Sequence, residues 1–437
     1  MADVQPLPGF RYAAADELAD LVTPPYDVIS AEAQERYYAR HPHNIIRLEL
    51  GRDEPGDDEL SNRYTRAAAT FAEWRRGGVL RQDTPSLYLY EQRFSIGGQS
   101  YARRSLLARV RLEPWEAGVI LPHERTLSKP KADRLQLMRA CAANLSPLMT
   151  LYDDPDGALA ALLGGAGART PDISFVDEAG EAHRLWLLRD EALADQVAAF
   201  FAARQLYIAD GHHRYETALA YRDEVAQQRK DLPAEDAANF TLMALAAIED
   251  PNLVVLPTHR LLRDLPAERL ARLDDTLRDY FEIEPLGGDI DAERALGALA
   301  EASAGGAETA FVLARPLETL LLRLQPAGRA AMDREHADAA PAWRRLDIAI
   351  LHELVLNHAL GVSDAAVRAG EHVSYTRDAA AALAAVRARD GAALAILVPP
   401  TPPAAIRDVA RAGARMPQKS TYFYPKLITG LVVNPLW

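Results

Sequence analysis

The chain has 437 residues, of which 49% are hydrophobic and 25% are charged, and this composition predicts a soluble globular protein of two or three domains. The formal net charge of −13 argues against nonspecific binding to nucleic acid or to an anionic membrane. The single cysteine, Cys141, excludes an intrachain disulfide framework and a multi-cysteine metal site, and its apolar helical surroundings predict a buried thiol. Residues 1–10 lack the features of a secretion signal, and no segment is apolar for the length of a membrane span, so we expect a cytoplasmic protein.

The first 50 residues begin with a turn-rich stretch and continue as an extended segment, because two successive prolines at 24 and 25 block a helix. Ser30 is a plausible N-cap for a helix that ends near Arg40, and residues 45–50 predict a strand. Tyr26 and Asp27, which follow the prolines, are candidates for lining a binding site. A turn aspartate beside a packed tyrosine explains them equally well.

The middle of the chain alternates helices and strands. Helices are predicted at 62–77, 132–144 and 190–204, a strand at 148–152, and two hairpins at 87–94 with 102–111 and at 173–177 with 182–188. A polar segment, 122–131, interrupts this pattern with a base, an acid and a cation: His123, Glu124 and Lys129. It is no zinc-protease motif, because no second histidine follows four residues after His123. A solvated charged loop is the alternative.

Residues 206–216 are the stretch around which the chain is organised. An apolar run ends in Asp210 and Gly211, and a helical pattern follows, which predicts a strand, a tight turn and a helix. Gly211 lets backbone amides approach a ligand, and the helix N-terminus favours an anion. The guanidinium fork of Arg214 matches phosphate or carboxylate oxygens, and Asp210 could act as a base or hold a metal. His212 and His213 could orient a ligand or transfer protons. The alternative is a polar loop with an ordinary turn.

The remaining chain predicts a helix to about Arg229, a charged linker at 227–237, a strand at 254–260, and a helix at 344–360. Further elements are a strand near 280–283 between two helices, an antiparallel pair at 310–314 and 319–324, a β-α-β unit at 371–398, and a helix at 403–412. His259 and Arg260 form a candidate ligand-facing pair, with a loop histidine and a surface arginine as the alternative.

Lysine is rare, since only five of the 49 basic residues are lysines, and four of these lie in 128–133 and 418–426. A lysine that persists in so arginine-rich a chain is a candidate for a role that needs a compact charge. The second stretch adds Lys419, Ser420 and Thr421, which suit a loop that binds phosphate or carboxylate, although the glycines of a Walker loop are missing. A strand with an amphipathic face is the alternative.

Four of these stretches, 24–29, 121–126, 209–216 and 417–426, resemble in sequence and in order the domain of unknown function 1015 family. The Asp-Gly-His-His-Arg motif at 210–214 is similar to the phosphate-binding box of the ParB and sulfiredoxin superfamily, and free serine kinases carry a similar box. Members of the family are often associated with serine biosynthesis. The resemblance implies an α/β (α+β) fold: a ParB/sulfiredoxin-like core in a domain at 1–230, and a second α/β domain at 238–437 that contributes the Gln-Lys-Ser-Thr loop. The ParB-like core is much smaller than this chain.

The resemblance implies nucleotide-linked phosphotransfer on serine or phosphoserine, as a kinase or a phosphoserine phosphatase, with ATP or ADP and Mg²⁺. Gly211, Arg214, Lys129 and Lys419 would then hold phosphates with Ser420 and Thr421, Glu124 or Asp210 would activate a hydroxyl, and one of these two would bind the magnesium. Tyr26, Asp27, His259 and Arg260 would contact the substrate. A nucleotide-operated switch of ParB type with a protein partner is the alternative. A His/Asp metal hydrolase lacks a recognisable ligand spacing. The sequence does not determine the oligomeric state, and a homodimer is one possibility.

Overall fold

The computed structural model describes residues 1–126, 128–230, 232–303, 309–388 and 391–437. These residues form two compact units. Unit 1 comprises Met1–Pro122, Thr126–Val254 and Pro425–Trp437, and unit 2 comprises His123–Arg125 and Val255–Tyr424. The division falls at 254–255 and not at the predicted linker, 227–237, because the following strand pairs within the sheet of unit 1. The last residues of the chain also return to unit 1.

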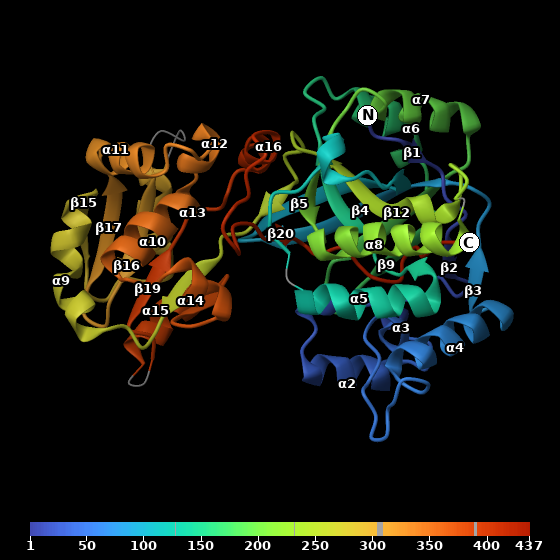
Figure 1. Ribbon diagram of the computed structural model, residues 1–437, viewed down its shortest axis with the longest axis horizontal. Coiled ribbons are helices and arrows are strands. Elements are labelled where there is room, and N and C mark those ends of the chain that lie inside the picture. Colours follow the sequence, from blue (N-terminus) through green and yellow to red (C-terminus); the bar gives the residue numbers. More distant parts are fainter. Residues whose placement is uncertain (127, 231, 304–308, 389–390) are drawn as a thin grey trace. The chain divides into compact units, whose positions relative to one another are not determined.

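Unit 1 is built on a large mixed sheet, drawn mostly in blue, cyan and green in Figure 1. Its strand order is β6-β11-β8-β12-β5-β4-β10-β9, and β1 pairs with β5. The strands are β1 (Val4–Gln5), β4 (Leu87–Ile96), β5 (Gln99–Arg111), β6 (Ile120–Leu121), β8 (Leu148–Tyr152), β9 (Ile173–Val176), β10 (Ala182–Leu188), β11 (Leu206–Asp210) and β12 (Phe240–Ala247). Both predicted hairpins are confirmed, as β4 with β5 and β9 with β10.

The helices of unit 1 pack on this sheet and on one another, and α5 lies alongside α8 (Figure 1). They are α1 (Leu18–Leu21), α2 (Ala31–Arg40), α3 (Ile46–Glu49), α4 (Arg63–Arg76), α5 (Ser128–Cys141), α6 (Ala158–Gly167), α7 (Glu191–Phe201) and α8 (His212–Arg229), with short 3₁₀ turns at Tyr26–Val28, Trp115–Ala117 and Ala237–Asn239. Smaller pairs join β2 (Phe10–Tyr12) to β3 (Leu80–Gln82) and β7 (Ala143–Asn144) to β21 (Asn434–Pro435).

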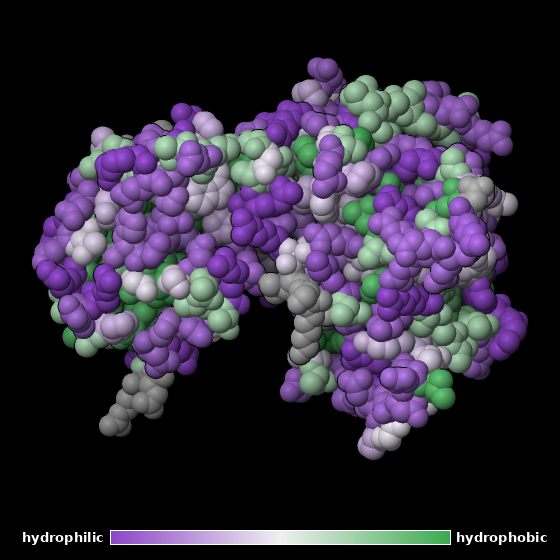
Figure 2. Space-filling view, viewed as in Figure 1, coloured by the Kyte–Doolittle hydropathy of each residue, from purple (hydrophilic) through white to green (hydrophobic). Residues whose placement is uncertain are grey.

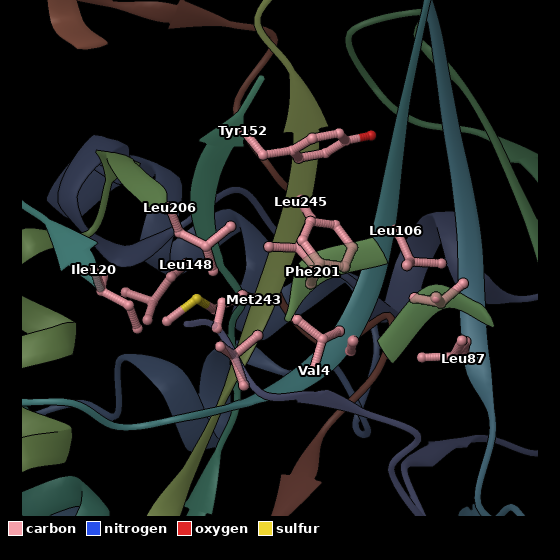
Figure 3. Packing of buried hydrophobic residues seen from close by; sticks show 14 of the residues in the cluster. Val4, Leu87, Leu106, Ile120, Leu148, Tyr152, Phe201, Leu206, Met243 and Leu245 are labelled. Carbon is pink, nitrogen blue, oxygen red and sulfur yellow. The ribbon is translucent and has the colours of Figure 1, made fainter. Parts of the chain in front are cut away.

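Alternation along the strands of unit 1 separates two kinds of side chain. One face carries Leu87, Leu106, Leu245 and their neighbours, which pack with Phe201 of α7 (Figure 3). Residues of α6 and α8 complete this core. The opposite face carries buried polar groups, among them Tyr90, Gln92, Arg103 and His183. Because successive strand residues point to opposite faces, one sheet supports both an apolar core and a polar surface.

One element of unit 1 was predicted wrongly. Residues 45–50, predicted as a strand, contain helix α3. The side chain of Asn44 accepts a hydrogen bond from the amide of Ile46 at 2.9 Å, and Ile45, Ile46 and Leu48 are buried. Tertiary burial and this local side-chain-to-backbone hydrogen bond override the strand preference of the two isoleucines.

Unit 2 is built on a six-stranded sheet in the order β15-β17-β16-β19-β14-β18. Its elements are β14 (His259–Leu262), α9 (Ala267–Arg278), β15 (Phe281–Gly287), α10 (Ala292–Ala302), β16 (Ala310–Ala314), β17 (Thr319–Leu324), α11 (Pro326–Glu335), α12 (Pro341–Arg344), α13 (Asp347–Ile350), a π-helix (Leu351–Ala359), α14 (Asp364–Ala369), β18 (Val373–Thr376), α15 (Ala379–Arg387), β19 (Leu394–Leu397) and α16 (Pro403–Arg411), and a short strand β20 (Phe423–Tyr424) pairs with β13 (Val254–Val255). The mixed α/β fold is therefore confirmed.

Two predictions in unit 2 need correction. The helix predicted at 344–360 is α13 followed by the π-helix, a rare form that is frequent at functional sites. The strand predicted at 254–260 is interrupted, because β14 begins only at His259 and runs between β18 and β19. The β-α-β unit is confirmed, since β18 and β19 both pair antiparallel with β14 and α15 connects them.

The visible faces of both units are mostly hydrophilic, with scattered apolar areas (Figure 2). Among the described residues, no helix has the length and hydropathy to cross a membrane. The Cys141 thiol is buried, as predicted, and burial raises its pKa to about 12, so it stays protonated at neutral pH.

Candidate functional site

The predicted strand, turn and helix around Asp210 are confirmed as β11, Gly211 and α8. The register of β11 against β8 shifts between Ile208 and Asp210, and such an irregularity re-aims the side chain that follows it. Gly211 has a φ of 96°, and a Cβ there would lie 2.7 Å from Leu148 Cδ2. Only glycine fits this turn, and it brings the start of α8 against the end of β11.

Asp210 is held by two cations. Its Oδ1 lies 3.2 Å from Lys426 Nζ, and its Oδ2 lies 3.3 Å from the Arg214 guanidinium. Burial alone would raise the pKa of Asp210, but Lys426 and Arg214 outweigh burial and hold the pKa well below its usual range. The carboxylate therefore stays ionised at neutral pH. Lys426 lies 216 residues along the chain from Asp210, so only the fold makes this pair.

The fork of Arg214 contacts protein acceptors. Its Nη1 donates to the Pro147 carbonyl at 2.6 Å and to Ser146 Oγ at 3.1 Å, while Nη2 faces Asp210. Ser146 Oγ in turn donates to the buried carboxylate of Glu49 at 3.2 Å. These contacts make Arg214 a tie between β8, β11 and α8, and a phosphate contact by its fork stays a prediction.

Tyr26 and Asp27 lie next to the start of α8. The guanidinium of Arg134 stacks over the Tyr26 ring at 4.1 Å. Burial raises the pKa of Tyr26 to about 12, although the nearby Arg214 opposes the shift. Asp27 is exposed and close enough to His213 to raise its pKa. Two of the four motif stretches thus meet in unit 1.

His213 is half-buried, and burial lowers its pKa. The nearby Glu216 raises this pKa, whereas Lys131 lowers it. Glu216 accepts hydrogen bonds from Lys131 Nζ at 2.8 Å and from Thr126 Oγ1 at 2.6 Å. His212, the first residue of α8, is buried. The end of the 121–126 stretch is thereby bound to the Asp210 stretch. Lys129 belongs to α5, but its side chain lies outside the described part of the structure.

Sequence reasoning missed the polar residues on β4 and β5. Arg103 Nη2 donates to the Pro425 carbonyl at 2.7 Å, and Gln92 Nε2 donates to the Lys426 carbonyl at 3.0 Å. Burial lowers the pKa of Arg103 to about 10. These two side chains fix the backbone that carries Lys426. In the sequence, these two residues are marked only by the position of Arg103, an arginine inside a predicted strand.

In unit 2, the 121–126 and 416–426 stretches meet. His123 Nε2 lies 3.2 Å from Thr421 Oγ1, and the His123 carbonyl accepts a hydrogen bond from the amide of Met416 at 2.7 Å. Ser420 is buried and donates to the Pro417 carbonyl, while Lys419 is exposed with a φ of 57°. A pocket of about 200 Å³ has Glu124 and Gln418 in its wall together with His352 of the π-helix and the arginines at 125, 368 and 415. The loop predicted to bind phosphate thus lies beside a polar pocket.

His259 and Arg260 are buried on β14, with 1% and 0% of their surfaces exposed. His259 Nδ1 accepts a hydrogen bond from the Val398 amide at 3.2 Å, and Arg260 donates to the Thr258 carbonyl. Burial lowers the pKa of His259 to about 4 and that of Arg260 to about 10. The pair was expected at the end of a strand, which is wrong, because His259 and Arg260 are the first two residues of β14 and this strand lies between β18 and β19. Substrate contact by the pair stays a prediction, and the burial of both side chains argues against it.

A cavity of about 550 Å³ opens on the other face of the large sheet, between β4, β5, β8, β12 and α6. Leu89, Leu106 and Leu245 form part of its wall, with Glu91 and Arg104 among the polar residues. None of the predicted site residues lines it.

Magnesium at Asp210 does not fit this geometry, because both carboxylate oxygens face a cation of the protein. A magnesium ion would have to displace Lys426 or Arg214. Glu124, with 29% of its side chain exposed, is the better of the two predicted magnesium ligands.

Residues 4–349 match the family model described as "Protein of unknown function (DUF1015)", and the chain belongs to this family. No curated protein matches it. Solved structures that resemble it include a conserved hypothetical protein from Pyrococcus furiosus, at 11% identity and a TM-score of 0.33, with 74% of this chain and 92% of that chain covered. A free serine kinase in complex with AMP matches at 10% identity and a TM-score of 0.31, covering 73% and 86%.

SbnI with a C-terminal truncation, from Staphylococcus aureus, matches at 10% identity and a TM-score of 0.34, covering 76% of this chain and 87% of that chain. Superpositions this loose place no ligand or catalytic residue on this chain by analogy. The site is therefore argued from its own residues.

Proposed function

We propose that the protein carries out nucleotide-linked phosphotransfer on a small amino acid, serine or phosphoserine, as a kinase or a phosphoserine phosphatase. One observation carries the proposal: the long helix α8 begins directly after Asp210 and Gly211, and its first turn, with His213, lies near Tyr26 and Asp27. A helix N-terminus with a glycine at its start is an anion-binding element, and the motif at 210–214 resembles a nucleotide-phosphate box.

The chemistry of phosphoryl transfer is mainly positioning and neutralisation of charge. The backbone at Gly211 would receive phosphate oxygens of ATP or ADP, with Lys129 as a further donor. In unit 2, Lys419, Ser420 and Thr421 would form a separate loop that binds phosphate or carboxylate. Arg214 would keep the loop in shape, since its fork already has protein acceptors. Mg²⁺ would accompany the nucleotide, with Glu124 as its candidate protein ligand.

The lowered pKa of Asp210 argues against this residue as the catalytic base. A carboxylate whose pKa lies well below its usual range accepts a proton poorly, so Asp210 serves as a fixed negative charge that positions Lys426. Glu124 would take the proton of the substrate hydroxyl, with His123 beside it at 3.8 Å. His212 and His213 would orient the phosphates, and Tyr26 with Asp27 would contact the amino acid.

The test is a screen for nucleotide consumption and phosphate release that combines ATP or ADP with serine, phosphoserine or neither, with Mg²⁺ or with chelator. We expect turnover that requires the amino acid. Asp210→Asn should lower it by about 10²–10³-fold, the usual cost of losing one preorganised charge. Arg139→Ala, an exposed arginine on α5, is the control and should leave it unchanged.

Two outcomes contradict the proposal. A wild-type protein that turns over none of these combinations is no such phosphotransferase. Slow nucleotide hydrolysis that ignores serine and phosphoserine would instead support the ParB-type switch. A folded Asp210→Asn protein with full turnover would remove the assigned site while leaving the reaction in place.

A further inference from the structure

The turn of the β9–β10 hairpin gathers three side chains that the proposed function does not use. Asp177, Glu181 and His183 each offer one ligand atom, and these atoms lie within 4.8 Å of one another. Asp177 Oδ1 accepts hydrogen bonds from the amides of Ala179 and Glu181, both at 2.9 Å. The turn thereby fixes the Asp177 carboxylate, and its other oxygen faces His183.

His183 is the most informative member of this cluster. It is 0% exposed, and its Nδ1 lies 2.8 Å from the Tyr90 hydroxyl. The imidazole stacks between the rings of Phe175, at 4.8 Å, and Tyr90, at 6.0 Å. The ring orientation is therefore fixed on both faces and at Nδ1, which aims Nε2 at the two carboxylates.

Nε2 of His183 lies 3.2 Å from Asp177 Oδ2, but its N–H direction is not aligned with that oxygen. A histidine and an aspartate that simply paired would align the N–H with the oxygen. Two ligands of one ion behave differently, because each points at the ion. At metal–ligand distances of about 2.0–2.2 Å, their atoms lie roughly 3 Å apart without facing each other. The pair has this off-axis geometry.

We infer that Asp177, Glu181 and His183 form a binding site for a divalent transition-metal ion, Zn²⁺ or Mn²⁺. Imidazole suits zinc, and carboxylates suit both zinc and manganese. Two carboxylates and a neutral imidazole carry two negative charges in sum, so a divalent ion would neutralise the cluster. With an ion on Nε2, Nδ1 would carry the proton and donate it to the Tyr90 hydroxyl, the second interaction that a metal-bound histidine usually makes.

The site would lie on the polar face of the large sheet. Glu181 and Asp210 both act on the pKa of Arg103, the residue that holds the Pro425 carbonyl. An ion at the hairpin would therefore share its charge environment with the Lys426 segment. The inference does not depend on the proposed phosphotransfer, since its evidence is the hairpin and its neighbour Tyr90 on β4.

The experiment measures metal content and affinity on the full chain. Protein stripped with chelator is dialysed against Zn²⁺ or Mn²⁺, and bound metal is quantified by elemental analysis and by isothermal titration, with melting temperature recorded on the same samples. Wild type should bind one equivalent in this site and gain melting temperature. His183→Gln and Asp177→Asn should each lose the equivalent, and Asp177→Asn keeps the turn because its amide oxygen still accepts both backbone hydrogen bonds.

Two further variants sharpen the test. Tyr90→Phe removes only the partner of Nδ1 and should weaken metal binding about 10–100-fold, the usual effect of such a supporting contact. His358→Gln is the matched control and should bind metal like wild type, because His358 Nε2 lies 3.1 Å from Glu335 but the pair belongs to no cluster of three ligand residues in the described part of the chain.

A wild-type protein that binds no more metal than folded Asp177→Asn overturns the inference and leaves His183 as a structural neighbour of Asp177. Equal binding by Tyr90→Phe and wild type would contradict the assigned role of Nδ1. Phosphotransfer that survives the loss of the metal would leave the proposed function standing, so the two claims fail separately.

Discussion

The Arg214→Ala variant tests whether Arg214 has a structural role or binds phosphate. The side chain is 12% exposed and donates to the Pro147 carbonyl, to Ser146 Oγ and toward Asp210. Alanine leaves the Pro147 carbonyl without this donor and leaves Asp210 with Lys426 as its cation. The tie between the start of α8 and the chain before β8 is lost with it.

The magnitude follows from the loss of one partner of a buried ion pair, which typically costs about 3–5 kcal/mol. The Asp210 carboxylate keeps Lys426 at 3.2 Å, so the lower end, about 3 kcal/mol, is expected. Arg214→Lys should recover part of this, because lysine keeps the charge and loses the fork. Nucleotide affinity per folded molecule should stay within a few-fold of wild type.

The assay is the free energy of unfolding in urea together with nucleotide affinity on the same variants. Arg139→Ala is the control, since Arg139 is 43% exposed and pairs with Glu224 at the surface, where an ion pair is worth about 0–1 kcal/mol. A well-folded Arg214→Ala protein whose affinity falls about tenfold to a hundredfold, the scale of a lost charge-assisted hydrogen bond, would refute this reasoning and restore Arg214 as a phosphate ligand.

Three further predictions concern Gly211, His259 and Asp210. Gly211→Ala should destabilise unit 1 by at least about 2 kcal/mol, because its φ of 96° strains any other residue and the added Cβ meets Leu148 at 2.7 Å; an unchanged urea midpoint would contradict this. His259 should cost up to about 3 kcal/mol of stability as pH falls from 6.5 to 4, because the unfolded chain binds the proton first, and His259→Gln should flatten that part of the pH profile. The contribution of Asp210, whose folded pKa is lowered, should be complete above about pH 4 and lost as pH falls further, so Asp210→Asn should show a weaker acid dependence than wild type.

Local patterns predicted much of the fold. The β4–β5 and β9–β10 hairpins, the strand that ends at Asp210 and the helix that follows Gly211 were all predicted, because alternation, turn residues and helical periodicity act over a few residues. Residues 45–50 show where local preference fails. Their isoleucines favour a strand, and burial together with the local hydrogen bond to the Asn44 side chain makes a helix.

The site divides in the same way. The sequence by itself determined that residues 210–214 form a glycine turn at a helix N-terminus, because only neighbours along the chain are involved. Only the tertiary structure decided that Lys426 pairs with Asp210, that the fork of Arg214 is taken by Pro147 and Ser146, and that His183 faces Asp177 off-axis. A side chain's partner depends on which strands lie side by side and on which face it points to, and a one-residue change of register would alter both.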